Sequence, residues 1–160
     1  SLQEYYVENS EKNDFISVDV PASIINLSEV QLDEKQRAGY ESVRKFNVLA
    51  FKVNDNNKTA YEAEKVKVKD ILNNPKYQEL MKFNNGKQRG TIKFLGTDAS
   101  IDELVIFGSD NSRGFALVRV LGDDMRPENM AALMEVINKA NVEGEEFEAL
   151  KGFFGNNNTR

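Results

Sequence analysis

Apolar and polar residues alternate over several short stretches of the chain, which is the period of a β-strand with one buried face. In residues 14–20 the three β-branched residues all fall on one side of such a strand. Pro21 follows and cannot donate a hydrogen bond to a sheet, so we expect the strand to end there. Residues 44–53 carry apolar side chains on both sides, which predicts a strand in the middle of a sheet.

The second half of the chain contains two predicted hairpins. The first joins residues 77–83 to residues 90–95 through Asn84-Asn85-Gly86, and Asn-Gly supplies the positive φ angles of a tight turn. In the second, a polar loop at residues 108–114 connects the strands 102–107 and 114–121. The two strands of a hairpin are antiparallel, so this half of the chain predicts at least four antiparallel strands.

Other stretches repeat apolar residues at helical spacing. We expect helices over residues 2–12, 33–43 and 58–74, in the segment that begins at Pro127, and in shorter turns at 22–27 and around Phe147 and Leu150. Within 58–74, four residues share one face of the helix: Tyr61, Val68, Ile71 and Leu72. Lys65 and Lys69 are expected to point to water.

This order of helices and strands predicts an α+β fold. We expect a mainly antiparallel sheet of about five or six strands, with helices packed mostly on one face. Residues 1–152 are predicted to form a single domain, followed by a polar tail at residues 153–160. Phe153 and Phe154 stand beside that tail, where they either close the core or mark a contact surface.

The composition then excludes many kinds of chemistry. The 160 residues include no Cys, no His and no Trp. The chain can therefore form no disulfide, no Ser-His-Asp triad, no thiol nucleophile and no zinc site of the Cys/His type. Its net charge of -5 argues against binding to nucleic acid, which needs clustered Lys and Arg. No apolar stretch approaches the roughly 20 residues of a membrane-spanning helix.

Three short motifs resemble parts of a serine β-lactamase site. Ser42 and Lys45 match S-x-x-K, residues 109–111 match S-D-N, and residues 58–60 nearly match K-T-G. However, the Lys-Thr pair precedes the Ser-Asp-Asn motif, and Ala60 replaces the glycine. We interpret these matches as coincidental and assign no catalytic, cofactor-binding or metal-binding residue to the chain.

Carboxylates are the remaining candidates for acid–base or metal chemistry. Asp98, Asp102 and Glu103 occupy one loop region, and Asp123 and Asp124 occupy another. If the loops converged, they could hold Ca²⁺, although the spacing of a calcium-binding loop is absent. The competing interpretation is that the second pair stabilises the N-terminus of the following helix.

Several segments together resemble the domain of unknown function 4252 family. They are the N-terminal helix, the strand Phe15-Ile16-Ser17-Val18, a strand–helix unit in the middle, and two hairpins that end in Val118-Arg119-Val120-Leu121-Gly122-Asp123 before a short amphipathic helix. The resemblance covers roughly residues 1–140. It supplies no catalytic or binding residue. Members are similar small proteins of Bacteroidota, made with an export signal and often lipoprotein-like.

The resemblance implies an exported protein of the periplasm or outer membrane, with an envelope protein as its partner. Since residue 1 is Ser, we also expect the native gene to encode a signal segment upstream of it. The favoured hypothesis is a non-catalytic binding or structural module of the bacterial cell envelope. The alternative is a carboxylate-based hydrolase or a calcium-dependent protein that uses the acidic loops.

Overall fold

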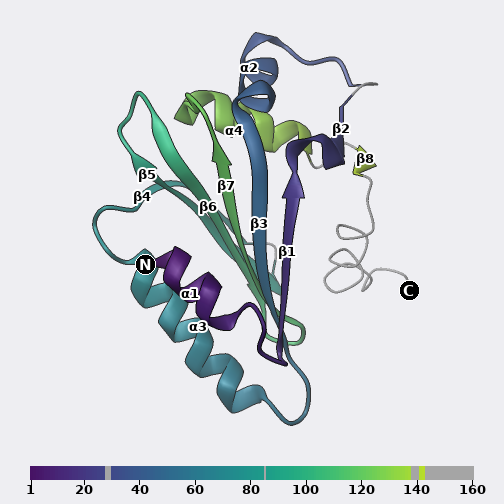
Figure 1. Cartoon of the computed structure of the whole chain (residues 1–160), viewed down its shortest axis with the longest axis vertical. Helices are drawn as coiled ribbons and strands as arrows, with labels where there is room; N and C mark the ends of the chain where they lie inside the picture. Colours follow the sequence, from purple (N-terminus) through teal and green to yellow (C-terminus); the bar gives the residue numbers. More distant parts are fainter. Residues whose placement is uncertain (28–29, 85, 138–140, 143–160) are drawn as a thin grey trace.

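In the computed structural model of the chain (Figure 1), residues 1–27, 30–84, 86–137 and 141–142 are described. Their elements, in chain order, are α1 (Leu2–Asn9), β1 (Phe15–Pro21), the 3-10 turn η1 (Ala22–Ile24), β2 (Ile25–Asn26), α2 (Glu34–Ser42), β3 (Val43–Lys52), α3 (Lys58–Leu72), β4 (Gln78–Asn84), β5 (Gln88–Gly96), β6 (Ile101–Asp110), β7 (Gly114–Gly122), α4 (Pro127–Ile137) and β8 (Asn141–Val142). The predicted helical turns at 22–27 are a single 3-10 turn followed by a short strand.

Six strands form one sheet in the order β1-β3-β7-β6-β5-β4, and every neighbouring pair is antiparallel. The predicted α+β class and antiparallel sheet are therefore confirmed. As expected, β3 lies inside the sheet, where its apolar residues face both sides. The short strands β2 and β8 pair with each other outside this sheet, with Ile25 opposite Val142.

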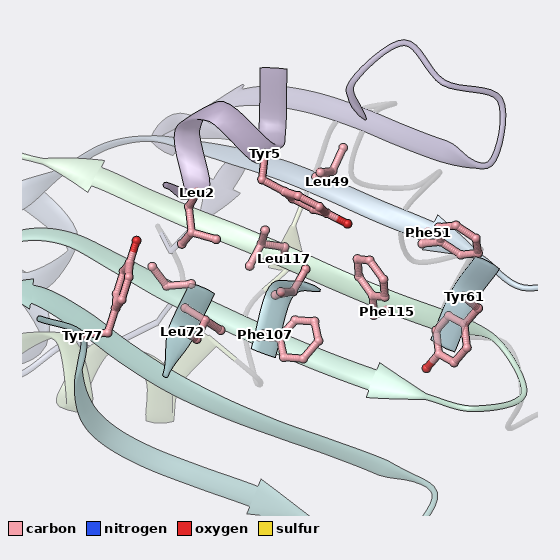
Figure 2. Packing of buried hydrophobic residues seen from close by; sticks show 12 residues of the cluster. Leu2, Tyr5, Leu49, Phe51, Tyr61, Leu72, Tyr77, Phe107, Phe115 and Leu117 are labelled. Atoms are coloured by element: carbon pink, nitrogen blue, oxygen red, sulfur yellow. The ribbon is translucent and has the colours of Figure 1, made fainter. Parts of the chain in front are cut away.

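One face of the sheet packs against α1 and α3 (Figure 1). The buried residues there include large aromatic side chains, and the rings of Phe51 and Phe115 stack at 5.7 Å. Figure 2 shows Tyr61 of α3 at the same end of this core, while Leu2 and Tyr77 lie at the other end. Burial of these rings supplies much of the apolar area that stabilises the domain.

The other face carries a second core beneath α2 and α4, so the expectation that the helices pack mostly on one face is wrong. Val120 and Leu104 point into this second core, whereas their strand neighbours Leu117 and Val105 belong to the first. Strands with apolar residues on both sides need cover on both sides. Helices α2 and α4 lie at one end of the sheet (Figure 1).

Close contact between these two helices depends on Gly39. A Cβ atom at this position would lie 2.5 Å from the backbone oxygen of Asn129 in α4. Gly39, inside the predicted helix over 33–43, therefore has a packing role, because it lets the backbones of α2 and α4 approach.

Both predicted hairpins are confirmed, but the loop of the second is shorter than expected. Its strands run to Asp110 and restart at Gly114, so the connection is only residues 111–113. The backbone nitrogen of Arg113 donates to the backbone oxygen of Asp110 at 2.9 Å, and Gly114 has a φ of 137°. A polar sequence such as Ser109-Asp110 can continue a strand when the adjacent strands supply the backbone hydrogen bonds of the sheet.

The prediction for Lys65 is also wrong, because its side chain is only 12% exposed. Its ammonium group lies 4.9 Å from the centre of the Tyr61 ring and donates to Asn111 Oδ1 at 2.8 Å. Helix periodicity places a side chain on a face, but it does not show which loop folds over that face.

None of the helices in the described part of the chain is long and apolar enough to cross a membrane. The predicted turn around Phe147 and Leu150 lies outside the described residues, as does the tail at residues 153–160.

Candidate functional site

Small residues line up across the middle of the sheet face that α2 and α4 leave partly uncovered. The register of the five strand pairs places one residue from each strand in a single row: Ile16, Ala50, Ala116, Gly108, Gly90 and Phe83. Residues directly opposite each other in antiparallel strands point to the same face. The four central strands thus contribute only alanine or glycine to this row, which leaves the sheet surface low there.

The ring of Phe83, on edge strand β4, lies over the end of the row. A Cβ atom at Gly90 would be 1.9 Å from Cζ of Phe83, and one at Gly108 would be 3.6 Å from the same atom. The ring therefore occupies the space that a side chain at Gly90 would fill. Phe83 is still 41% exposed, which makes it an apolar wall open to solvent.

Between this wall and the neighbouring strands lies an open groove of about 200 Å³, which we call the sheet groove. It is lined by Phe83, Gln88, Arg89, Ile106, Gly108, Ser109, Asp110, Ala116 and Val118. Because most of the lining is apolar and the floor is low, the sheet groove suits aliphatic or aromatic groups that lie flat on the sheet.

One cation lies near the hairpin end of the sheet groove, because Lys87 is close enough to Asp110 to help lower its pKa. Arg89 borders the groove, but the register aligns it with Ser109 and Phe115, so its side chain belongs to the opposite face of the sheet. A ligand that combines apolar groups with a carboxylate would suit both the floor and Lys87.

Asp110, at the same end, is held by its own turn. Its Oδ1 accepts hydrogen bonds from the backbone nitrogen of Ser112 at 2.9 Å and from the Ser112 hydroxyl at 2.6 Å. Burial opposes ionisation of this carboxyl, but these hydrogen bonds, Arg113 and Lys87 outweigh it and lower the pKa. Asp110 is therefore an ionised carboxylate that stabilises the turn, and it has no proton to donate to a substrate.

A polar network lies on the opposite face of the sheet, against α1. Arg119 donates to Glu103 through Nε at 2.9 Å and Nη2 at 3.1 Å, and through Nη1 to Asn47 at 3.4 Å. Asn47 in turn donates to Asp19, which also accepts from the Tyr6 hydroxyl at 2.8 Å. The network ties four neighbouring strands to a helix.

Sequence reasoning missed this network. One signal was available, because Arg119 continues the alternation of Phe115 and Leu117 and so places a charge on a buried face. A buried charge needs a partner. Glu103 is that partner, but nothing in its own sequence neighbourhood distinguishes it from Asp102.

The acidic loops are adjacent, since the backbone nitrogen of Ile101 donates to the backbone oxygen of Met125 at 2.7 Å. Their carboxylates nevertheless point to different places. Glu103 faces Arg119, whereas Asp123 pairs with the exposed Arg44 at 3.0 Å. Among the described residues, no three Asp or Glu side chains form a group that could hold a metal ion.

Asp123 and Asp124 also do not cap α4, because that helix begins at Pro127. The backbone oxygen of Arg126 accepts from the backbone nitrogens of Asn129 and Met130, which places Arg126 at the N-cap. The capping part of the competing interpretation is therefore wrong, whereas a favourable interaction of these negative charges with the N-terminus of α4 stays a prediction.

The β-lactamase-like motifs do not come together either. Ser42 precedes the first residue of β3, and its hydroxyl donates to the backbone oxygen of Gly39. Ser109 and Asn111 lie near the other end of the same strand, since Asp110 pairs with Gly114 and Gly114 pairs with Lys52. A strand from Val43 to Lys52 spans about 30 Å at the rise of a β-strand.

Comparison with known families agrees with the resemblance found in the sequence. The family described as "Domain of unknown function (DUF4252)" matches residues 5–133, well over half of the chain. The matched region contains every residue that lines the sheet groove. No curated protein matches the chain.

Proposed function

We propose that this chain, which belongs to the DUF4252 family, is a non-catalytic binding module of the bacterial cell envelope. The observation that carries the proposal is the sheet groove, a concave apolar surface with Lys87 near its hairpin end. We take its partner to be a segment of an envelope protein that presents apolar side chains and a carboxylate. The family resemblance supports the location in the envelope.

The geometry of the sheet groove supports binding rather than chemistry. Its floor is Gly108 and Ala116 and its wall is the Phe83 ring, none of which carries a nucleophile or a general base. Asp110 also lines the groove, but its carboxylate is held by two hydrogen bonds from Ser112 and closes its own turn. Contact with flat apolar groups and one ion pair would supply affinity and orientation.

The alternative function in the acidic loops has no observation in its favour among the described residues. Asp98 and Asp102 are exposed, and Glu103 is already paired with Arg119. A hydrolase that uses these loops would need two carboxylates that face one substrate site.

The test compares two variants that carry the same substitution on different faces. Ala116→Arg places a long cation on the floor of the sheet groove, whereas Ala60→Arg changes an exposed position on α3. Each tagged variant is incubated with the envelope fraction of the native bacterium, and the retained proteins are compared with those of the unmodified chain. We expect Ala116→Arg to lose a partner that Ala60→Arg retains.

Equal capture by all three chains would contradict the proposal. Because Ala116 is half-buried, a second pair of variants separates binding from folding. Phe83→Ala removes the exposed wall, and Val66→Ala removes an exposed apolar side chain from α3 as its control. Circular dichroism melting shows whether each variant is folded.

The location is tested separately. The open reading frame upstream of Ser1 should encode a basic start followed by an apolar stretch. The native protein should fractionate with the periplasm or outer membrane. Its recovery in the cytosolic fraction would contradict the envelope part of the proposal and leave the binding surface as it is.

A further inference from the structure

We infer that the side of the protein between α3 and the β4–β5 hairpin docks on an anionic phospholipid surface. Four cations form this side, and we call them the basic face: Lys69, Lys82, Arg89 and Lys93. The inference goes beyond the proposed function, because the basic face and the sheet groove lie on opposite faces of the sheet. It depends neither on the sheet groove nor on the location of the protein.

The charges of the chain are unevenly distributed along its sequence. Of the 21 Lys and Arg, eight lie in residues 65–93, together with only two of the 26 Asp and Glu. This segment therefore has a charge of +6 in a chain whose net charge is -5. The single carboxylate within β4 and β5 is Glu79. Such a separation of charge turns one side of a molecule toward an anionic surface.

The register of the strands brings three of the cations together on the face of the aromatic core. Lys82 lies directly opposite Thr91, and Thr91 lies opposite Phe107, which belongs to that core. Arg89 and Lys93 lie two residues before and two residues after Thr91. Both are therefore diagonal neighbours of Lys82, at about 7–8 Å, and point to the same face of the sheet.

Helix α3 adds Lys69 to these cations. Helix α1 lies beside α3 (Figure 1) and donates a hydrogen bond to Glu64 at 2.7 Å, so Glu64 marks the flank of α3 that faces α1. Lys69 points about 140° away from Glu64 around the helix, toward the other flank. One turn further on, the backbone oxygen of Leu72 accepts from Lys93 Nζ at 2.8 Å, which places this end of α3 beside β5.

Most of the positive charge of the basic face has no partner within the described part of the chain. Lys69 and Arg89 are exposed, and the side chain of neither makes a hydrogen bond or an ion pair with another described residue. Lys82 is 71% exposed and approaches Glu79 only to 3.7 Å. An exposed pair of this kind contributes little, so Lys82 can pair with an external anion instead.

This arrangement suits several phosphate groups in a plane. Arg89 and Lys93 are about 13 Å apart along β5, which is wider than a single phosphate group. A nucleic-acid strand is the less suitable polyanion, because its bases need exposed aromatic rings among the cations. Phe83, the exposed aromatic residue of this hairpin, points to the opposite face with Gly90. A bilayer against the basic face would also leave the sheet groove turned away from the lipid.

Sedimentation with sucrose-loaded vesicles measures the binding directly. The full chain is mixed with vesicles of equal parts phosphatidylglycerol and phosphatidylcholine, or with vesicles of phosphatidylcholine alone. We expect the chain to sediment only with the anionic vesicles and to be released as salt is added, because salt screens exposed charges. Sedimentation with both kinds of vesicle, or with neither, would overturn the inference.

Two double variants of equal net charge test where the contact lies. Lys69→Gln with Arg89→Gln should weaken binding to the anionic vesicles about 30-fold, since each cation near such a surface contributes about 1 kcal/mol. Lys35→Gln with Arg37→Gln removes two exposed cations from α2 and should bind as the unmodified chain does. Circular dichroism melting shows that both variants are folded. An equal loss in the two variants would overturn the inference.

Two soluble ligands distinguish the source of the phosphate groups. Inorganic phosphate should release the chain from the anionic vesicles no better than sodium chloride of the same ionic strength. A specific release would indicate a site for a single phosphate and overturn the inference, as would tighter binding to a DNA duplex at equal phosphate concentration. None of these samples contains a protein partner, so their outcome is independent of partner capture by the Ala116→Arg variant.

Discussion

Arg119 on β7 donates two hydrogen bonds, at 2.9 and 3.1 Å, to the carboxylate of Glu103 on β6, although the two residues are 16 positions apart. Their side chains are only 10% and 12% exposed. The exposed pair Arg44–Asp123 has a similar distance of 3.0 Å, but its side chains are 61% and 77% exposed. The chain thus contains a buried ion pair and a matched surface pair.

We expect Arg119→Met to lower the free energy of unfolding by about 3–5 kcal/mol, because it leaves Glu103 without its donors in a buried site. Arg44→Met is the control and should cost about 0–1 kcal/mol. Urea unfolding measures both. Adding Glu103→Leu to Arg119→Met should recover part of the loss, and a double variant as unstable as the sum of the single variants would contradict this account.

Leu117→Ala should destabilise the fold far more than Ser112→Ala. Leu117 is 1% exposed in the aromatic core, so truncation costs about 2–5 kcal/mol. Ser112 lies in the hairpin turn, where its hydroxyl donates to Asp110, so its loss costs about 1 kcal/mol. Urea midpoints of the two variants decide the order. A loss from Ser112→Ala as large as that from Leu117→Ala would show that the turn is central to stability.

Gly39→Ala should destabilise the protein, although alanine is the better helix former by about 1 kcal/mol. The new Cβ would lie 2.5 Å from a backbone oxygen of α4, which cannot move aside cheaply. We expect a net loss of about 1–3 kcal/mol. Ala38→Gly, at an exposed position of the same helix, measures propensity alone and should cost about 1 kcal/mol. A gain of stability in Gly39→Ala would disprove the close packing of α2 and α4.

Stability should fall in alkali as the pH rises above about 10. Burial, and then the negative charges of Glu62 and Asp110, raise the pKa of Tyr61 from 10.0 to about 12. Burial and the hydrogen bond to Glu64 raise the pKa of Tyr5 as well. Because the folded pKa lies above the unfolded one, the stability from these groups is complete below pH 10 and is lost as the pH rises through the folded values.

The measurement is urea unfolding between pH 9 and pH 12, together with the absorbance of the phenolate. Tyr61→Phe should lose less stability than the unmodified chain over this range, whereas the two should have parallel profiles below pH 9. A tyrosine titration that is complete near pH 10 in the folded protein would contradict the expected shifts.

Calorimetric titration with Ca²⁺ and Zn²⁺ should show no saturable binding. The chain has no His or Cys for Zn²⁺, and Glu103 and Asp123 are committed to arginines. The Asp123→Asn, Asp124→Asn double variant is the comparison. Saturable Ca²⁺ binding that this variant abolished would restore the calcium hypothesis.

The local pattern of the sequence was enough to predict the class of the fold. Alternation over 14–20 and 44–53, the Asn-Gly turn and the helical spacing after Pro127 each describe a segment whose own residues determine its geometry. The composition also excluded thiol, imidazole and disulfide chemistry. What these patterns could not predict was how the segments cover one another, as Lys65 and the helices on both faces show.

The sheet groove and the buried ion pair were decided by the tertiary structure alone. Ala50, Gly90, Gly108 and Ala116 come from four different strands, and they form one floor only because the register aligns them. A shift of one residue in any strand would turn its small residue to the other face. The sequence determined which strands exist, while the register, set by the packing of both cores at once, determined what their faces present.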